Sequence, residues 1–127
     1  MTSRPKNKRL YKKALEILTL SRSISGYLIH DLNQLDANGH ENPFIYFTGD
    51  IIQQSDSLVP EIIKAENQTF QDDRIKYANS LETLTNRLYR NCERLEGSES
   101  NGKDFVILLR KELKKFKKLQ RRWMMTL

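Results

Sequence analysis

Apolar residues recur every three or four positions along almost the whole of this 127-residue chain. In the first such segment the stripe consists of Leu10, Ala14, Ile17, Leu18, Ile24, Leu28, Leu32 and Leu35. This spacing places the apolar side chains on one side of an α-helix. Because no strand-like alternation competes with it, the sequence predicts an all-α fold.

Three further segments carry the same spacing. Their predicted core stripes are Phe44, Phe47, Ile51, Leu58, Ile62 and Ala65; then Ala78, Leu81, Thr85, Leu88, Cys92 and Leu95; then Phe105, Leu109, Leu113, Phe116, Leu119 and Trp123. We expect helices at about 6–37, 43–67, 70–96 and 102–125, in a single domain over residues 1–127. Short links between them favour an antiparallel, up-down-up-down four-helix bundle.

Polar and flexible residues mark the predicted helix ends. Asn38 or Gly39 can adopt the left-handed conformation that closes the first helix. Asn42 is expected to cap the second helix, a capping box to begin at Thr69 before the third, and Asn101 to start the fourth.

Pro60 lies inside the apolar stripe of the second predicted helix. Proline removes one intrahelical hydrogen bond, and its ring clashes with the carbonyl four residues earlier. We therefore expect a kink near Asp56–Pro60, because the stripe keeps its phase across the proline. The alternative is two shorter helices.

Charge is unevenly distributed along the chain, whose net charge is +6. Residues 4–13 carry +6 and residues 103–122 carry +7, whereas residues 14–102 carry −7. In an antiparallel bundle the first helix starts at the end where the fourth helix finishes, so the two basic segments are expected to converge there.

The basic residues of the fourth helix fall into two strips beside its apolar stripe. One strip is Arg110, Lys114, Lys117 and Arg121, and the other is Lys111, Lys115, Lys118 and Arg122. The concentration of positive charge predicts a nucleic acid as the ligand. Because contacts with phosphate would release counterions, binding should weaken steeply with salt. The candidate binding residues are these eight together with Arg4, Lys8, Arg9, Lys12, Lys13, Arg87, Arg90 and Arg94.

Other interpretations of the charge remain open. Lysine and arginine are good helix formers on solvated faces, and a basic last turn favours the helix macrodipole. An acidic protein partner, simple solubility and a membrane surface are therefore alternatives. A membrane surface fits least, because the apolar face of the fourth helix is needed for the core. No stretch is long and apolar enough to span a bilayer, and we expect a cytoplasmic protein.

Signals for an enzyme, a cofactor or a metal are weak in this sequence. It has no glycine-rich phosphate loop, no cysteine pair and no metal-ligand spacing of histidines. His30 falls opposite the apolar stripe, and its distance from Arg22 does not fit the Arg-then-His spacing of helical HEPN-type ribonucleases. Cys92 is expected to be a small core residue. We therefore expect no enzymatic activity.

Glu112 is unusual because it falls on the apolar side of the fourth helix, between Leu109 and Phe116. A buried carboxylate without a partner is costly, so we expect an ion pair, with Arg74 as the candidate partner. A catalytic acid or a residue at an interface are the alternatives.

The layout of residues 8–125 resembles a family of small bacterial four-helix bundles. This family includes the accessory variability determinant (Avd) of diversity-generating retroelements and the proteins encoded by intervening sequences of 23S ribosomal RNA genes. The most similar stretch is "DRIKYANSLETLTNRLYRNCERL", which has the family's Arg-Ile start at Arg74 and Ile75. The last helix ends on Trp123, as in many members, but Arg121 and Arg122 stand where the family commonly has two glycines.

This resemblance implies a basic accessory protein without enzymatic activity. It would bind RNA and a reverse transcriptase and support mutagenic synthesis of complementary DNA. It also implies a homo-oligomer, a ring-like pentamer in the case of Avd. A structural or protein-interaction bundle without a nucleic-acid role is the alternative.

Overall fold

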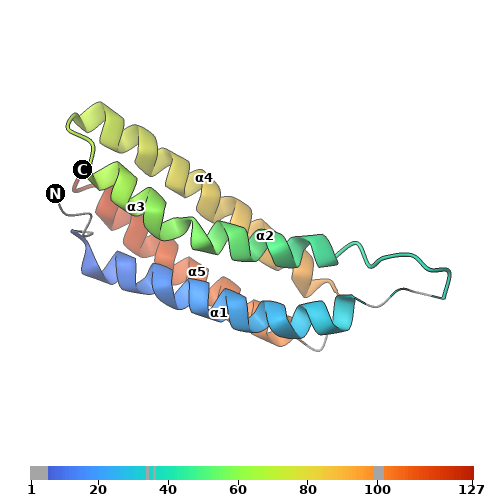
Figure 1. Ribbon diagram of the computed structural model, residues 1–127. Helices are drawn as coiled ribbons and strands as arrows, with labels where there is room; N and C mark the ends of the chain where they lie inside the picture. The colour runs from blue at the N-terminus through green and yellow to red at the C-terminus, as the bar shows by residue number, and fades with distance from the viewer. Residues whose placement is uncertain (1–5, 34, 36, 99–101) are drawn as a thin grey trace.

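A computed structural model describes residues 6–33, 35, 37–98 and 102–127. Within them the chain forms the helices α1 (Lys8–Leu32), α2 (Ile45–Asp56), α3 (Leu58–Glu66), α4 (Gln71–Glu96) and α5 (Lys103–Met124), shown in Figure 1. The predicted all-α fold is confirmed.

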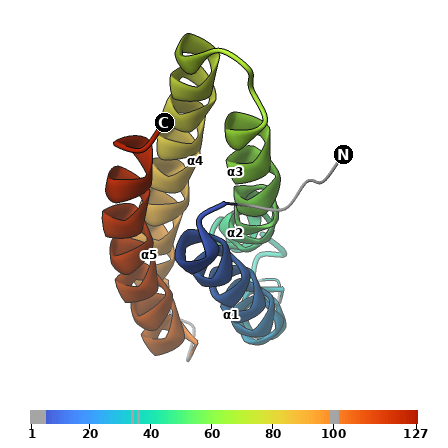
Figure 2. The same cartoon turned by 90° about the vertical axis from the view of Figure 1, so that its left-hand side faces the viewer.

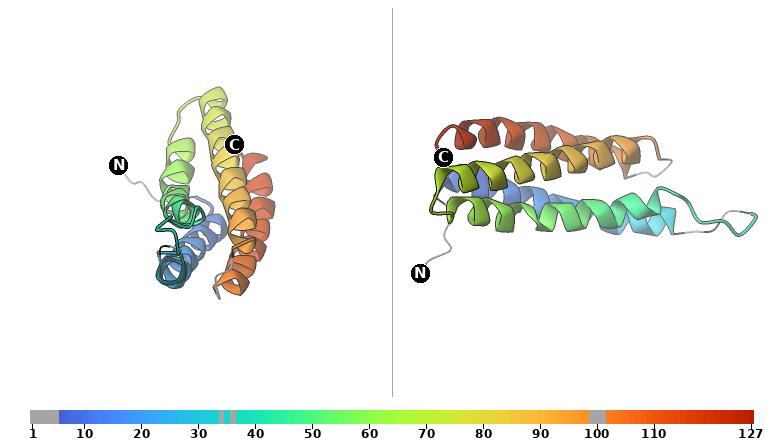
Figure 3. Two further views of the ribbon diagram at one scale, coloured as in Figure 1. Left: turned by 90° about the vertical axis from the view of Figure 1, so that its right-hand side faces the viewer. Right: turned by 90° about the horizontal axis from the view of Figure 1, so that it is seen from above.

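The helices form an antiparallel bundle in which α2 and α3 act as the two arms of one long helix (Figures 1 and 3). Each helix packs on its chain neighbours, and α1 and α5 close the bundle by packing on each other. The α2–α3 helix and α5 therefore occupy opposite corners, as do α1 and α4. The start of α1 and the end of α5 lie at the same end of the bundle (Figure 2).

The predicted kink in the second helix is confirmed, with a bend of 30°. Pro60 has no N–H to donate to the carbonyl of Asp56, so the regular ladder is interrupted one turn earlier. The backbone N–H of Ser57 lies 3.2 Å from the carbonyl oxygens of both Gln53 and Gln54. The Ser57 hydroxyl donates a further hydrogen bond to the Gln53 carbonyl, over 2.9 Å.

The core contains most of the predicted stripe residues, with corrections at two helix ends. Leu35 is 61% exposed because α1 ends at Leu32, five residues earlier than expected. Among the four residues 33–36 only Leu35 is apolar. A further helical turn would therefore gain too little burial to form. At the start of α5, Phe105 is 48% exposed and the neighbouring Val106 is buried in its place.

The helix starts use the predicted caps only in part. The Asn42 side chain accepts from the Phe44 N–H over 3.0 Å, but α2 begins only at Ile45. The capping box at Thr69 is wrong, because the N-cap of α4 is Phe70, whose ring cannot accept a hydrogen bond. The predicted cap Asn101 lies outside the described residues.

Asn7 provides a cap for α1 that the sequence interpretation did not include. Its side-chain oxygen accepts from the Leu10 N–H over 3.1 Å. In the middle of the link between α1 and α2, Gly39 has a φ of 77°, the left-handed conformation. It lies seven residues beyond Leu32, so it shapes the link between α1 and α2 and does not cap the helix.

Candidate nucleic-acid interface

The buried face of α5 fixes where its basic residues point. That face comprises Val106, Leu109, Leu113, Phe116, Gln120 and Trp123. Helical spacing then turns Arg110, Lys114, Lys117 and Arg121 toward α4, and we call these residues the α4-side strip. Lys111 and Arg122 are exposed on the outside of the bundle, Lys118 is exposed beside the α4-side strip, and Lys115 pairs with Glu112 of the same helix.

Four cations surround a hollow of about 260 Å³ between α4 and α5. Lys114, Lys117, Lys118 and Arg121 line it from α5, and Tyr89 lines it from α4. The ammonium of Lys117 lies 5.1 Å from the centroid of the Tyr89 ring. No carboxylate is among the described residues that line this hollow, so its electrostatic potential is positive.

Arg110 is the member of the α4-side strip that is least available to a ligand. Its guanidinium donates to both carboxylate oxygens of Glu96, over 2.8 Å each, and to the Tyr89 hydroxyl over 3.2 Å. The hydrogen bonds to Glu96 raise the pKa of Arg110 above its ordinary value. Arg110 therefore ties α5 to α4 and orients Tyr89 beside the hollow.

Glu112 forms an ion pair, but its predicted partner Arg74 is wrong. Its carboxylate accepts from Lys13 of α1 over 3.0 Å and from Lys115 over 3.2 Å. Lys13 holds the pKa of Glu112 below its ordinary value. Arg74 instead donates to the carbonyl oxygens of Leu127 and, in the α3–α4 link, of residues 68 and 69. Two predicted binding residues, Lys13 and Lys115, are thus partly neutralised.

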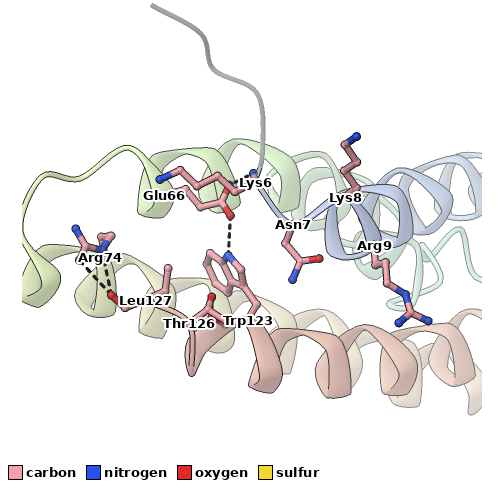
Figure 4. A pocket seen from close by; sticks show the side chains of 9 residues that line it. All are labelled: Lys6, Asn7, Lys8, Arg9, Glu66, Arg74, Trp123, Thr126 and Leu127. Carbon is pink, nitrogen blue, oxygen red and sulfur yellow. Dashed lines mark hydrogen bonds between the residues drawn. The ribbon is translucent and has the colours of Figure 1, made fainter.

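The start of α1 and the end of α5 lie at the same end of the bundle, as predicted, but no basic residue of 103–122 lines the hollow found there. A hollow of about 700 Å³ at this end is lined by Lys6, Asn7, Lys8, Arg9, Glu66, Arg74, Trp123, Thr126 and Leu127 (Figure 4). Figure 4 shows the Arg9 side chain extending toward α5, whereas Lys8 points away from it. Arg4, also predicted to bind, lies outside the described residues.

The strongly buried carboxylate of this end is Glu66, which the sequence interpretation missed. It is 6% exposed and accepts from the Trp123 indole N–H over 2.9 Å and from the Lys6 backbone N–H over 2.8 Å (Figure 4). Glu66 follows the core residue Ile62 by four positions, one helical turn. That spacing was the available signal that it would be buried.

Arg87 and Arg94 of α4 do not join the basic surface of α5. The third predicted arginine, Arg90, is exposed and is not among the described residues that line the hollow beside Tyr89. Arg94 lies 5.3 Å from the centroid of the Phe47 ring of α2 and donates to Asn91 over 2.9 Å. Arg87 precedes Arg94 by two helical turns and shares its side of α4. The side of α4 that faces α5 carries other residues, including Tyr89.

A different face of the bundle, between α1 and α5, is apolar. Its hollow of about 520 Å³ has Leu15 and Leu20 of α1 and Leu108 of α5 in its lining, together with the charged residues Lys12, Glu16 and Glu112. Farther along the same pair of helices, Tyr27 and Phe105 stack with ring centroids 5.8 Å apart, and both are exposed. Exposed apolar surface of this kind favours contact with another macromolecule.

Comparison of the chain with protein-family models, with curated proteins and with solved structures gives no match. None of the helices in the described ranges is long and apolar enough to cross a lipid bilayer. The described residues also contain no group of three or more His, Cys, Asp or Glu side chains placed to hold a metal ion.

Proposed function

We propose that this protein binds RNA through the basic surface of α5 and has no enzymatic activity. The observation that carries the proposal is the hollow beside Tyr89, where four cations meet without a carboxylate. Phosphate groups would supply the missing negative charge, and the release of their counterions would supply much of the affinity.

The internal ion pairs strengthen this argument. Glu96 is held by Arg110, and Glu112 by Lys13 and Lys115. Within the described part of the chain, Lys114 and Lys118 have no such carboxylate. Their charge therefore remains available to steer and bind a polyanion.

The resemblance to Avd extends the proposal to a biological setting. On this hypothesis the RNA is the template of a reverse transcriptase in a diversity-generating retroelement, and the protein acts in the bacterial cytoplasm as an accessory factor. A gene for a reverse transcriptase and a pair of repeats beside the gene for this protein would support it. Co-purification of the two proteins would test their contact directly.

Fluorescence anisotropy with a labelled, structured RNA at rising salt tests RNA binding. The affinity is expected to fall steeply with salt. A plot of the logarithm of the association constant against the logarithm of the salt concentration should have a negative slope of about 0.7 to 0.9 for each phosphate contact. The variant K114Q/K118Q should lower both the affinity and the slope, the latter by about 1.5. R87Q/R90Q removes the same charge from α4 and is the matched control, which should bind nearly as the parent protein does.

RNA binding would be disproved if the parent protein fails to bind at low salt, or binds without sensitivity to salt. An equal loss in both double variants would instead show that net charge acts at a distance and that the α5 surface has no special role.

A protein-interaction bundle is the second candidate, favoured by the apolar α1–α5 face. On this hypothesis Leu15, Leu20 and Leu108 contact a second copy of the chain or another protein. Sedimentation velocity would show self-association of the parent protein, and L108Q should reduce it. A monomeric parent protein at high concentration would exclude self-association through this face.

A further inference from the structure

The side-chain amide of Gln120 has an unsatisfied donor inside the bundle. Gln120 is 2% exposed, and its Nε2 is a buried side-chain nitrogen without a hydrogen-bond partner in the described structure. An unpaired buried donor lowers the stability of a fold, and natural proteins contain few of them. A ligand that accepts a hydrogen bond from Gln120 would remove this cost.

Gln120 lines a hollow of about 200 Å³ between α4 and α5. Lys117 and Arg121 stand beside it, at three positions before and one after, and Glu82 and Asn86 of α4 complete the lining. Within the described residues, Arg121 forms no ion pair, and Lys117 contacts only the Tyr89 ring as a cation. Two cations without an ion pair in the described part of the chain therefore flank a buried donor, with one carboxylate, Glu82, in the same lining.

We propose that this hollow binds one phosphodiester group, with Lys117 and Arg121 pairing with the phosphate oxygens and the Gln120 side chain turning from its buried position so that Nε2 donates a hydrogen bond to the phosphate. The amide of Asn86 provides a further donor from the opposite helix. The site rests on the proposed RNA function and assigns to it a specific contact. Charged hydrogen bonds from a buried donor and a guanidinium orient a phosphate as well as attract it.

Glu82 determines which phosphate the hollow prefers. Two cations and one carboxylate leave the lining with a net charge of +1. That charge matches the single negative charge of a phosphodiester, and Glu82 repels the higher charge of a phosphate monoester more strongly than it repels the phosphodiester. The ligand class is therefore the backbone of a polynucleotide and not a free or terminal phosphate.

The hollow also continues into the one beside Tyr89, because Lys117 and Arg121 line both. The two hollows therefore adjoin each other between α4 and α5, and we call the pair the groove. An extended strand can place one phosphate over Gln120 and the next group beside the Tyr89 ring. Base stacking on an aromatic ring commonly accompanies backbone contacts of this type.

Replacement of Gln120 by methionine separates a ligand contact from a structural role. Q120M removes the unpaired donor and keeps a similar length, so the melting temperature should rise or stay unchanged. The affinity for RNA should nevertheless fall roughly tenfold, the loss expected for one hydrogen bond to a charged group. A purely structural glutamine would change stability without changing RNA affinity, and unchanged affinity in Q120M would overturn the site.

A matched pair of charge variants tests the groove in a second way. K117Q/R121Q removes one lysine and one arginine from the groove, and K111Q/R122Q removes the same from the outer surface of α5. Both variants lose the same net charge. We nevertheless expect the loss of RNA affinity to be at least fivefold greater in the groove variant than in the outer-surface variant. Equal losses would overturn the site and leave the proposed RNA function in place.

The phosphate contact can be observed directly by nuclear magnetic resonance. Dimethyl phosphate, a monoanionic phosphodiester, should shift the side-chain amide signal of Gln120, which is assigned by its absence in Q120M. Inorganic phosphate at equal concentration should shift it less. If dimethyl phosphate shifts the signal but RNA does not bind, the site stands and the RNA function fails; no shift with either ligand overturns the site.

Discussion

Trp123 of α5 donates its indole N–H to the carboxylate of Glu66 of α3, across the diagonal of the bundle, over 2.9 Å. These two helices lie at opposite corners, so the hydrogen bond spans the core at the end where α1 starts and α5 finishes. The same carboxylate accepts the Lys6 backbone N–H. One residue of α3 thus orients the ends of both α1 and α5.

Glu66→Gln should destabilise the fold by about 1–3 kcal/mol. The amide provides one oxygen acceptor where the carboxylate provides two, so the indole or the Lys6 N–H is left unpaired. Urea unfolding followed by fluorescence of Trp123, the single tryptophan, measures the change. Glu93→Gln on the exposed surface of α4 is the control and should change stability by less than about 0.5 kcal/mol.

The Lys13–Glu112 ion pair should make stability depend on pH at both ends of the range. The pKa of Glu112 is lowered from 4.5, so its contribution is present above pH 4.5 and is lost as the pH falls through the folded-state value. The pKa of Lys13 is raised from 10.5, mainly by Glu16 and then by Glu112, so that contribution is lost above pH 10.5.

Glu112→Gln should accordingly remove part of the acid dependence, about 1 kcal/mol between neutral pH and pH values below about 4. Denaturant unfolding of both proteins across this range provides the measurement. If the free energy of unfolding of Glu112→Gln falls with acid pH as much as that of the parent protein, the ion pair does not contribute to stability.

Cys92 should react slowly with disulfide reagents in the folded protein. The thiol is fully buried, and burial raises its pKa to about 12. At pH 8 the thiolate fraction is then lower by roughly three orders of magnitude than in the unfolded chain, where thiols titrate near 8.5. Ellman's reagent should therefore label the protein rapidly in guanidinium and at least about a hundredfold more slowly in buffer. Rapid labelling in buffer would place the thiol at the surface.

Asn7→Ala should lower stability by about 1 kcal/mol, because the mutation removes the side-chain acceptor for the Leu10 N–H at the start of α1. Asn79→Ala is a useful comparison, since Asn79 is exposed in the interior of α4. Alanine is the better helix former there, so this substitution should leave stability unchanged or slightly raise it. Thermal unfolding by circular dichroism distinguishes the two opposite effects.

The helix periods and the proline could be interpreted without a structure because they act locally. The apolar spacing placed Leu109, Leu113 and Phe116 in the core, and Pro60 bent its helix as expected. Phe105 was misplaced because Phe105 and Val106 both border the apolar side of α5. Only the packing of neighbouring helices decides which of two adjacent apolar residues is covered.

In the candidate site, too, some features could be predicted from the sequence and others depended on how the helices pack. Its basic strips on α5 were visible in the sequence, but the partners of individual charges were not. Arg110 proved to be bound to Glu96, and Glu112 to Lys13 in place of Arg74. These contacts join residues on different helices, whose relative rotation and level a one-dimensional pattern does not contain.

The sequence by itself determined the all-α class, the four helical segments, the bend at Pro60 and the concentration of positive charge at both ends of the chain. Each follows from residues that are close in sequence, through hydrogen bonding, backbone sterics or charge density. The tertiary structure alone decided that Glu66 is the buried acid, that Arg94 of α4 packs against Phe47 of α2, and that the Gln120 Nε2 lies unpaired beside Lys117 and Arg121. Those outcomes depend on how the helices dock, because docking selects which polar groups lose water and which find a partner.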